Sequence, residues 1–175
     1  MKVIQGGFTL IELLMVISIM GVLFSVVLPA VNGARDKAHV TAAIMELDAL
    51  RTVMERLSQD TGYYPNGDTS YCRDVSSVPN NELDLSQASA NLVANGSGWV
   101  GWGGPYISDA TDPWGTPYYL DEDYQCFTAT EGCRGLNDAG TDSSVIVSCG
   151  PNKAMNNGSC AYDDDNVVYR LCDAG

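Results

Sequence analysis

An apolar run near the N-terminus decides how much of this chain can fold in water. Phe8–Val31 contains 24 residues with one charged side chain, Glu12, and Leu13–Val31 contains 19 residues with none. A helix of that length, rising about 1.5 Å per residue, crosses the ~30 Å hydrocarbon layer of a bilayer. A secretory signal peptide has a shorter apolar core, about 7–15 residues, before a small-x-small cleavage site. The run therefore predicts a transmembrane helix, and Lys2 ahead of it favours a cytoplasmic N-terminus.

Two residues of this run are candidates for a special role. A carboxylate such as Glu12 is costly in an apolar span unless it is neutralised or paired, which makes it a functional candidate. The alternative is an interfacial side chain that the helix dipole favours near a helix start. Pro29, near the far end, lacks a backbone donor and either stops the helix or kinks it. Because a helical pattern resumes beyond it, we favour a continuing helix.

Apolar residues after Pro29 recur at helical spacing. The stripe consists of Val40, Ile44, Leu47, Leu50, Met54 and Leu57. Steps of three and four place these side chains on one face of a helix. We expect that helix to end at Thr61 with Gly62 as its cap and Pro65 beyond. A helix over residues 8–60 would be roughly 80 Å long, and its second half needs a small head to cover the stripe.

The rest of the chain has a different composition. Residues 1–59 carry five acidic and five basic side chains, so residues 60–175 hold the whole net charge of −13, together with all six cysteines and every Trp and Tyr. The acidity argues against a nucleic-acid binder, which needs a basic face, and against electrostatic attachment to anionic lipid. Six cysteines in such a head indicate three disulfides in an oxidising compartment.

Six cysteines allow fifteen pairings, of which we favour one. Cys126–Cys133 and Cys149–Cys160 are sequence neighbours that would close short loops, and Cys72–Cys172 follows by elimination. There is no C-x-x-C, and His39 is far from the cysteines in sequence, which argues against a zinc site or a thiol-redox enzyme. The glycine-rich segment 96–104 follows no apolar strand and opens no helix, so we expect no phosphate loop. No Ser-His-Asp or Cys-His arrangement suggests an enzyme.

The leader resembles a known family. GGFTLIELLMVISIMGVL is similar to the class III leader of type IV pilins and type II secretion pseudopilins. In that family a membrane aspartyl peptidase cuts after the glycine and the new N-terminus is methylated, which implies cleavage between Gly7 and Phe8 and an N-methylated Phe8. The resemblance also implies that Glu12 pairs with the amino terminus of a neighbouring subunit, and that Pro29 kinks the helix.

The resemblance extends beyond the leader, and there it favours one branch of the family, the major (G-type) pseudopilin of type II secretion. It rests on LDALRTVMERLSQDTGYYP, GGPYISDATDPWGTPYYL and VIVSCGPNKAMNNGSCAYDDDNVVYRL, and it leaves 66–102 and 122–143 uncovered. In that branch the last segment is a strand–loop–strand whose Gly-Pro-Asp turn and Asp-Asp pair hold calcium.

The resemblance therefore implies a calcium site in this loop. Its ligands would be Asn152, Asp163, Asp164 and Asp165. Calcium takes about 6–8 oxygen ligands, which clustered carboxylates supply. Here Asn152 stands for the family's Asp and Lys153 for its Gly, and both changes reduce the negative charge around a cation. The alternatives are a solvated acidic turn, or a loop stapled by Cys149–Cys160 with or without a metal.

These observations predict an α+β pilin fold, in which a long N-terminal transmembrane and filament helix packs on a small antiparallel sheet. Strands are expected near 117–121, 144–149 and 166–171, and a short helix over 86–94 with Asp84 or Ser86 as its cap. The expected parts are a leader peptide (1–7), a membrane and filament-core helix (8–31), its amphipathic continuation (32–62) and a disulfide-containing extracytoplasmic head (63–175).

The family implies a structural subunit that polymerises through its helix. We expect the major subunit of a type II secretion pseudopilus, held in the bacterial inner membrane with a periplasmic head before it joins a periplasmic filament. Expected partners are further copies of the chain, minor pseudopilins, the prepilin peptidase and the inner-membrane assembly platform, and no nucleic acid. The alternatives are a type IV pilin for adhesion, motility or DNA uptake, which the cysteines and the long 66–102 loop support, and a membrane-anchored binding or enzymatic domain.

Overall fold

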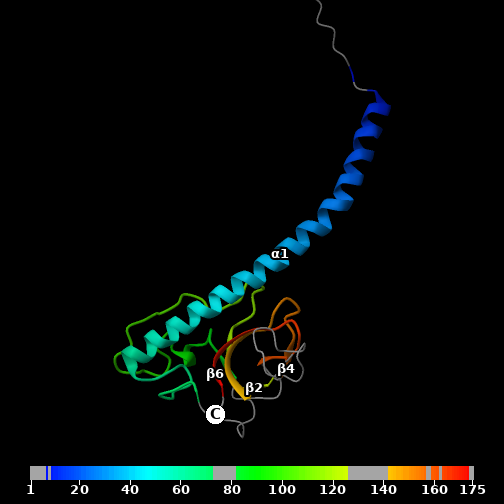
Figure 1. Cartoon of the computed structure of the whole chain (residues 1–175). Coiled ribbons are helices and arrows are strands. Elements are labelled where there is room, and N and C mark those ends of the chain that lie inside the picture. Colours follow the sequence, from blue (N-terminus) through cyan, green and yellow to red (C-terminus); the bar gives the residue numbers. More distant parts are fainter. Residues whose placement is uncertain are drawn as a thin grey trace, which may run out of the picture. The chain divides into compact units, whose positions relative to one another are not determined.

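The computed structural model describes residues 7, 9–72, 82–125, 142–156, 159–161 and 163–173. One long helix, α1 (Leu10–Thr61), is followed by the strands of a small head (Figure 1). The chain divides into two compact units, Met1–Ala38 and His39–Gly175. The C-terminal part of α1 therefore belongs to the head unit.

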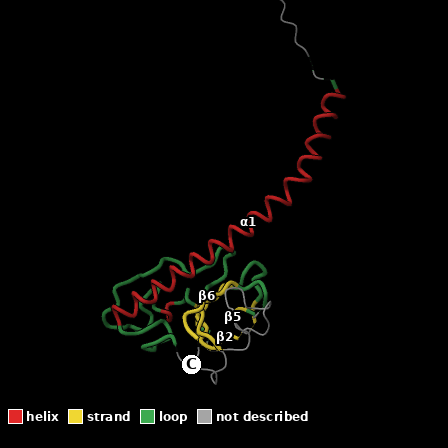
Figure 2. Tube along the Cα trace, in the orientation of Figure 1, coloured by secondary structure: helices red, strands yellow, loops and turns green. Residues whose placement is uncertain are grey.

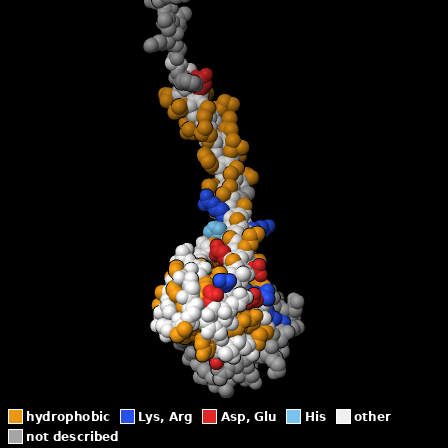
Figure 3. Space-filling model, turned by 90° about the vertical axis from the view of Figure 1, so that its left-hand side faces the viewer, with side chains coloured by type: hydrophobic (Ala, Val, Ile, Leu, Met, Phe, Trp, Pro, Cys, Tyr) orange, Lys and Arg blue, Asp and Glu red, His pale blue; other side chains and the backbone are white. Residues whose placement is uncertain are grey.

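The first unit consists mainly of the apolar part of α1. Its large apolar side chains from Leu10 to Leu28 are exposed along the helix, where Figure 3 draws them in orange. Within the part of the chain that the structure describes, α1 is the helix long and apolar enough to cross a membrane. A helix with apolar side chains on every face needs lipid or other helices around it.

The end of α1 lies where the sequence predicts it. Gly62 adopts a left-handed conformation (φ +84°), and its N–H donates to the Ser58 carbonyl at 2.8 Å. The Thr61 hydroxyl donates to the Leu57 carbonyl at 2.8 Å and accepts from the Tyr63 N–H at 3.1 Å. These contacts satisfy carbonyl groups that the last turn of a helix leaves without partners.

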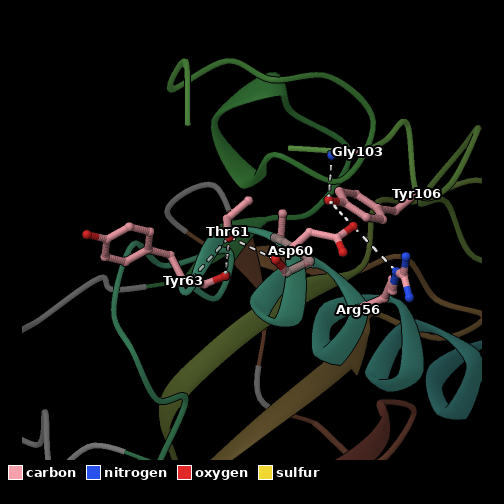
Figure 4. Close-up of polar contacts among 7 residues, drawn as sticks. Arg56, Asp60, Thr61, Tyr63, Gly103 and Tyr106 are labelled. Carbon is pink, nitrogen blue, oxygen red and sulfur yellow. Dashed lines mark hydrogen bonds and ion pairs between the residues drawn. The ribbon is translucent and has the colours of Figure 1, made fainter. Parts of the chain in front are cut away.

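A second group of contacts fixes this helix end to the loop before the sheet (Figure 4). The Tyr106 hydroxyl donates to Asp60 Oδ2 at 2.9 Å and accepts from the Gly103 N–H at 3.0 Å. Arg56 forms an ion pair with the same Asp60 oxygen at 3.4 Å. Burial of the phenol, together with the nearby Asp60 carboxylate, raises the pKa of Tyr106, so this hydroxyl keeps its proton and continues to donate.

The head contains a four-stranded sheet in the order β1-β2-β3-β6. Its strands are β1 (Leu83–Asp84), β2 (Tyr119–Gln125), β3 (Asp142–Ser148) and β6 (Val167–Asp173), and each neighbouring pair is antiparallel. Figure 2 draws the strands in yellow, with β2 and β6 labelled. A separate ribbon of β4 (Met155–Asn156) and β5 (Ser159–Cys160) lies between β3 and β6 in sequence. The α+β fold is thus confirmed, and β2, β3 and β6 overlap the three predicted strands.

The main core lies between one face of α1 and one face of the sheet. Its buried residues include Ala43, Leu47, Leu50, Met54 and Leu57 from the helix, and Tyr118, Leu120, Ile146 and Val167 from the sheet side. Side chains alternate between the two faces of a strand. The intervening residues therefore form a second cluster, which includes Tyr119, Val145, Val147 and Val168.

The predicted stripe is wrong at one position. Ile44 is 50% exposed, whereas Ala43 is fully buried. Neighbouring positions of a helix differ by about 100° around its axis. The face that meets the sheet therefore runs through Ala43, and Ile44 lies at the edge of that face.

The helix expected over 86–94 is also wrong. Of these residues only Ala88–Ala90 are helical, as the 3₁₀ turn η1. Asp84 Oδ1 accepts from the N–H and the hydroxyl of Ser86 at 2.8 and 2.6 Å, so it stabilises a local turn rather than a helix start. Asn91 follows in the left-handed conformation (φ +59°) and accepts from the Ser97 N–H at 2.9 Å, which directs the chain into a loop.

Two tyrosines, one just before β2 and one in β6, reach carboxylates of α1. The Tyr118 hydroxyl donates to Glu46 Oε2 at 2.6 Å, and the Tyr169 hydroxyl donates to Asp48 Oδ1 at 3.0 Å. Burial, followed by the Glu46 carboxylate, raises the pKa of Tyr118 far above its usual range, which keeps this phenol a donor. These bonds fix the position of the helix along the sheet.

Two of the expected disulfides are present. Cys72–Cys172 joins residues 100 apart, with a Cα–Cα distance of 5.8 Å, and connects the loop after α1 to β6. Cys149–Cys160 joins residues 11 apart at 4.9 Å. The third expected pair, Cys126–Cys133, lies outside the described residues. In the chain-entropy model, closing a loop of about 100 residues stabilises a protein by roughly 4–5 kcal/mol, because it lowers the conformational entropy of the unfolded chain.

We expect Leu50→Ala to lower the free energy of unfolding by about 2–5 kcal/mol, because it leaves a cavity between α1 and the sheet. Ile44→Ala is the matched control on the same helix, and its half-exposed side chain should cost less than about 1 kcal/mol. Urea unfolding of the full chain in detergent, followed by tryptophan fluorescence, measures both changes. Equal losses would contradict the helix face described above.

Candidate functional site

The first candidate site lies where α1 begins. Thr9 precedes the first helical residue, and its N–H and hydroxyl both donate to Glu12 Oε2, at 2.9 and 2.7 Å. The Glu12 N–H donates in turn to the Thr9 hydroxyl at 3.3 Å. This reciprocal pair is a capping box, which satisfies backbone donors at a helix start. Thr9 is not among the residues predicted from the sequence, although Thr-x-x-Glu is the signature of this motif.

Glu12 therefore has a partner within its own chain. Both bonds from Thr9 end on Oε2, and Oε1 takes part in neither. Glu12 and Gly7 are exposed, whereas Phe8, the residue expected to follow the cleavage point, lies outside the described residues. A cation from another molecule would meet a carboxylate that Thr9 already orients.

Pro29 lies inside α1, and the helix continues from it to Thr61. The alternative in which Pro29 ends the helix is therefore wrong. An internal proline removes one backbone hydrogen bond without ending a helix that other contacts support. The expected kink at this residue stays a prediction.

In the head, Asp112 organises the Asp-Pro-Trp-Gly turn. Its Oδ1 accepts from the N–H groups of Trp114 and Thr116 at 3.0 and 2.8 Å. Its Oδ2 accepts from the hydroxyls of Thr116 and Ser148, both at 2.6 Å. The Asp112 side chain is buried, and a buried carboxylate requires such donors in place of water. The turn was identified through the family resemblance, but no role was predicted for Asp112.

Contacts lead from Asp112 to the loop that follows β3. Ser148, the last residue of β3, donates to Asp112 and accepts from the Gly150 N–H at 3.1 Å. Gly150 has a φ of +69°, and a Cβ at this position would lie 2.0 Å from the carbonyl oxygen of Asp165. Only glycine fits where the two ends of the loop approach each other this closely.

Two of the four expected calcium ligands meet across this loop. Asn152 Nδ2 donates to Asp163 Oδ2 at 2.8 Å, and Asn152 Oδ1 accepts from the Ala154 N–H at 2.8 Å. Asp163 Oδ1 accepts from the Asp165 N–H at 3.1 Å, and Asp164 is exposed. Among the residues that the structure describes, no three Asp, Glu, His or Cys side chains gather as a metal site.

Beneath the loop, Asn166 connects the β4–β5 ribbon to the sheet. Its Nδ2 donates to the Ala161 carbonyl at 2.7 Å and to the Tyr124 hydroxyl at 3.3 Å, and both Asn166 and Tyr124 are fully buried. Burial raises the pKa of Tyr124 to about 12; the charges of Asp121 and Asp163 act in the same direction, and the Asn166 hydrogen bond opposes them. The phenol therefore stays neutral at ordinary pH.

The Cys149–Cys160 disulfide closes the same region. Cys149 is 0% and Cys160 3% exposed, and Cys149 Sγ lies 3.4 Å from Met155 Sδ. The disulfide joins the residue after β3 to the end of β5. The loop is thus held covalently as well as through hydrogen bonds.

Comparison with known proteins gives three kinds of match. Residues 4–28 match the prokaryotic N-terminal methylation motif. The chain is 32% identical over 142 residues to type II secretion system core protein G of Escherichia coli K12 (81% of this chain, 85% of the relative), and 29% identical over 143 residues to that of Aeromonas hydrophila (81% and 90%). It is 37% identical over 70 residues to the type IV major pilin protein PilE of Neisseria gonorrhoeae (40% and 42%). No solved structure gives a significant match.

We expect Asp112→Ala to lower the free energy of unfolding by about 3 kcal/mol or more, because buried donors lose a charged acceptor. Asp109→Ala is the control, since Asp109 is exposed and accepts from the Thr111 hydroxyl; it should cost less than about 1 kcal/mol. Urea unfolding of the full chain in detergent measures both variants. Similar small losses would show that Asp112 does not hold the turn.

Proposed function

The chain belongs to the family of the type II secretion system core protein G, and from this premise we propose that it is the major subunit of a type II secretion pseudopilus. Copies polymerise through α1 into a filament that drives protein export across the outer membrane. One observation carries the proposal: similarity to core protein G extends over 81% of the chain and includes the head, whereas similarity to the type IV pilin covers 40%.

The role is structural rather than enzymatic. The relatives are pilin and secretion-system subunits by name, and the apolar helix with its prepilin motif fits a membrane-anchored pilin-like protein. Before assembly, α1 holds the subunit in the bacterial inner membrane, with the head in the periplasm. After assembly, the same apolar side chains contact helices of other copies in place of lipid.

Processing prepares the N-terminus for this assembly. The prepilin peptidase cleaves between Gly7 and Phe8, and Phe8 is methylated. The ammonium of one subunit then pairs with Glu12 of a neighbour, whose Oε1 is not used by Thr9. This pairing offsets the cost of placing a carboxylate among apolar helices.

The remaining partners follow from the same role. They are further copies of the chain, minor pseudopilins and the inner-membrane assembly platform. Nucleic acid is not a partner, because a net charge of −13 repels phosphate. A type IV pilin is the second candidate, favoured by the cysteines of the head, of which the described residues form two disulfides, and by the long segment 66–102.

Deletion of the gene in its host distinguishes the two candidates. Loss of a pseudopilus subunit stops the release of exoproteins and leaves surface fibres unchanged. Loss of long surface fibres and of twitching motility, with secretion intact, would contradict the pseudopilus and support the pilin.

We expect Glu12→Ala to be cleaved normally but to form no filaments, because no carboxylate remains for the neighbouring ammonium. Thr9→Ala is the matched control: it removes the hydroxyl of the capping box, at a cost of about 1 kcal/mol in helix stability, and leaves Glu12 in place. Immunoblots of the processed chain and electron microscopy of filaments measure the two steps. Equal failure of both variants would assign Glu12 to helix capping alone.

We also propose that the loop after β3 binds calcium through Asn152, Asp163, Asp164 and Asp165. In the structure the amide nitrogen of Asn152 faces Asp163, so binding requires the Asn152 oxygen to take that place. Oxygen and nitrogen of an amide exchange by a half-turn about the last side-chain bond. Carboxylate and amide oxygens suit calcium, and the cation replaces the Asn152–Asp163 hydrogen bond.

Calcium should raise the Tm of the full chain in detergent relative to the EDTA-treated protein, and Asp164→Ala with Asp165→Ala should abolish the shift. Asn152→Asp should enlarge it, because a second carboxylate beside Asp163 repels it without a cation and adds a ligand with one. Differential scanning fluorimetry measures these shifts. If neither the unmodified chain nor Asn152→Asp responds to calcium, Cys149–Cys160 is the staple of this loop.

A further inference from the structure

The two described disulfides of the head differ in their access to solvent. Cys72 is exposed and Cys172 is half-buried, whereas Cys149 and Cys160 are 0% and 3% exposed. We propose that Cys72–Cys172 is a thiol–disulfide exchange site open to a dithiol oxidoreductase of the thioredoxin class, and that Cys149–Cys160 is closed to such a partner. The proposal concerns the folded chain and does not depend on which filament the chain forms.

The surroundings of Cys149–Cys160 exclude an attacking thiolate. Exchange requires a thiolate to reach one of the two sulfurs, so access controls the rate. Cys149 Sγ contacts Met155 Sδ at 3.4 Å. Both cysteines belong to the second buried cluster, which also includes Tyr119, Val145, Val147 and Val168. Reaction at this disulfide therefore requires the β4–β5 ribbon to open first.

Cys72 presents the opposite situation. It lies in the loop after α1, outside the strands of the sheet, and its N–H donates to the Ser70 hydroxyl at 3.0 Å. Cys172 lies in β6, opposite Ser144 of β3, within a ladder that runs from Val167 to Asp173. Because this ladder holds β6 independently of the disulfide, opening Cys72–Cys172 leaves the sheet in place.

The exchange consists of two successive displacements, in each of which a thiolate forms one S–S bond and breaks another. A thiolate of the partner attacks Cys72 Sγ, which forms a mixed disulfide and releases Cys172 as a thiolate that takes up a proton. The second thiolate of the partner attacks its own half of the mixed disulfide and releases Cys72. The partner is oxidised to a disulfide and the chain gains two thiols; the oxidised partner closes the bridge by the reverse steps.

The consequence is a head whose stability changes without a change of fold. Cys72–Cys172 closes a loop between residues 100 apart in the sequence. Cys149–Cys160 closes a smaller loop, between residues 11 apart, within the larger one. Opening the outer bridge restores freedom to the unfolded chain, while the contacts between α1 and the sheet remain. A reduced head is therefore folded but easier to unfold than an oxidised one.

The experiment treats the full chain in detergent with reduced thioredoxin or, separately, with dithiothreitol. Samples are alkylated at intervals and each cysteine is identified by peptide mass, so that Cys126 and Cys133 are scored separately. We expect Cys72 and Cys172 to be labelled at least about tenfold faster than Cys149 and Cys160 with both reagents, with an unchanged circular dichroism spectrum. Equal rates, or faster labelling of Cys149 and Cys160, would overturn the proposal. Reaction with dithiothreitol but not with thioredoxin would overturn the proposed class of partner.

Two variants separate access from general loosening of the head. Cys72→Ser combined with Cys172→Ser should fold, and its Cys149–Cys160 bridge should stay as slow as in the unmodified chain. Met155→Ala, which uncovers the Cys149 sulfur, should accelerate labelling of Cys149 and Cys160 and leave Cys72 unchanged. If the double variant exposes Cys149 and Cys160 to rapid labelling, protection comes from the outer bridge and the proposed burial mechanism is wrong.

Discussion

The apolar side chains of α1 between Leu10 and Leu28 need a non-aqueous environment, which the described part of the chain does not provide. Leaving such surface in water costs about 25 cal/mol per Å² of apolar area. Further along, the same helix buries one face in the core that it shares with the sheet. The helix is thus adapted to two environments, and the two compact units meet between Ala38 and His39, after the apolar run has ended. The proposed membrane anchoring and assembly would both use the apolar part of α1.

Neutral donors take the place of cations at the carboxylates that organise the head. The chain has 22 acidic and 9 basic residues, so its lysines and arginines are too few to pair one to one with its carboxylates. Asp112 accepts from two N–H groups and two hydroxyls, and Glu46 accepts from the Tyr118 hydroxyl. Hydrogen bonds with one charged partner are stronger than neutral ones. Part of the acidity of the chain therefore stabilises turns and the contact between helix and sheet.

Local patterns explain what the sequence predicts correctly. Helix periodicity and Gly62 locate α1 and its end, and the resemblance to pseudopilins locates β2, β3 and β6. The Thr9–Glu12 capping box is equally local, so it could have been recognised from spacing alone.

Contacts between residues far apart in the sequence account for the features that the sequence does not predict. A stripe with steps of three and four does not decide between Ala43 and Ile44, because the position of the sheet selects the buried face. The segment 86–94 does not form a helix because Asn91 bonds Ser97 and, through its carbonyl, the Trp102 indole. The role of Asp112 depends on Ser148, 36 residues away.

The placement of Cys72–Cys172 also determines how the head responds to tension along α1. A pull on the N-terminal part of α1 loads the contacts between the helix and the sheet first, because those contacts lie before Thr61, where the helix ends and the segment that leads to Cys72 begins. If those contacts gave way, the segment between Thr61 and Cys72 could extend to an end-to-end length of roughly 35–40 Å at 3.3–3.6 Å per residue. Further lengthening stops there, because the disulfide bypasses the hundred residues that contain the sheet. A force between the helix and Cys172 then passes through the bond between the two sulfur atoms, and not along the chain from Cys72 to Cys172 that contains most of the sheet.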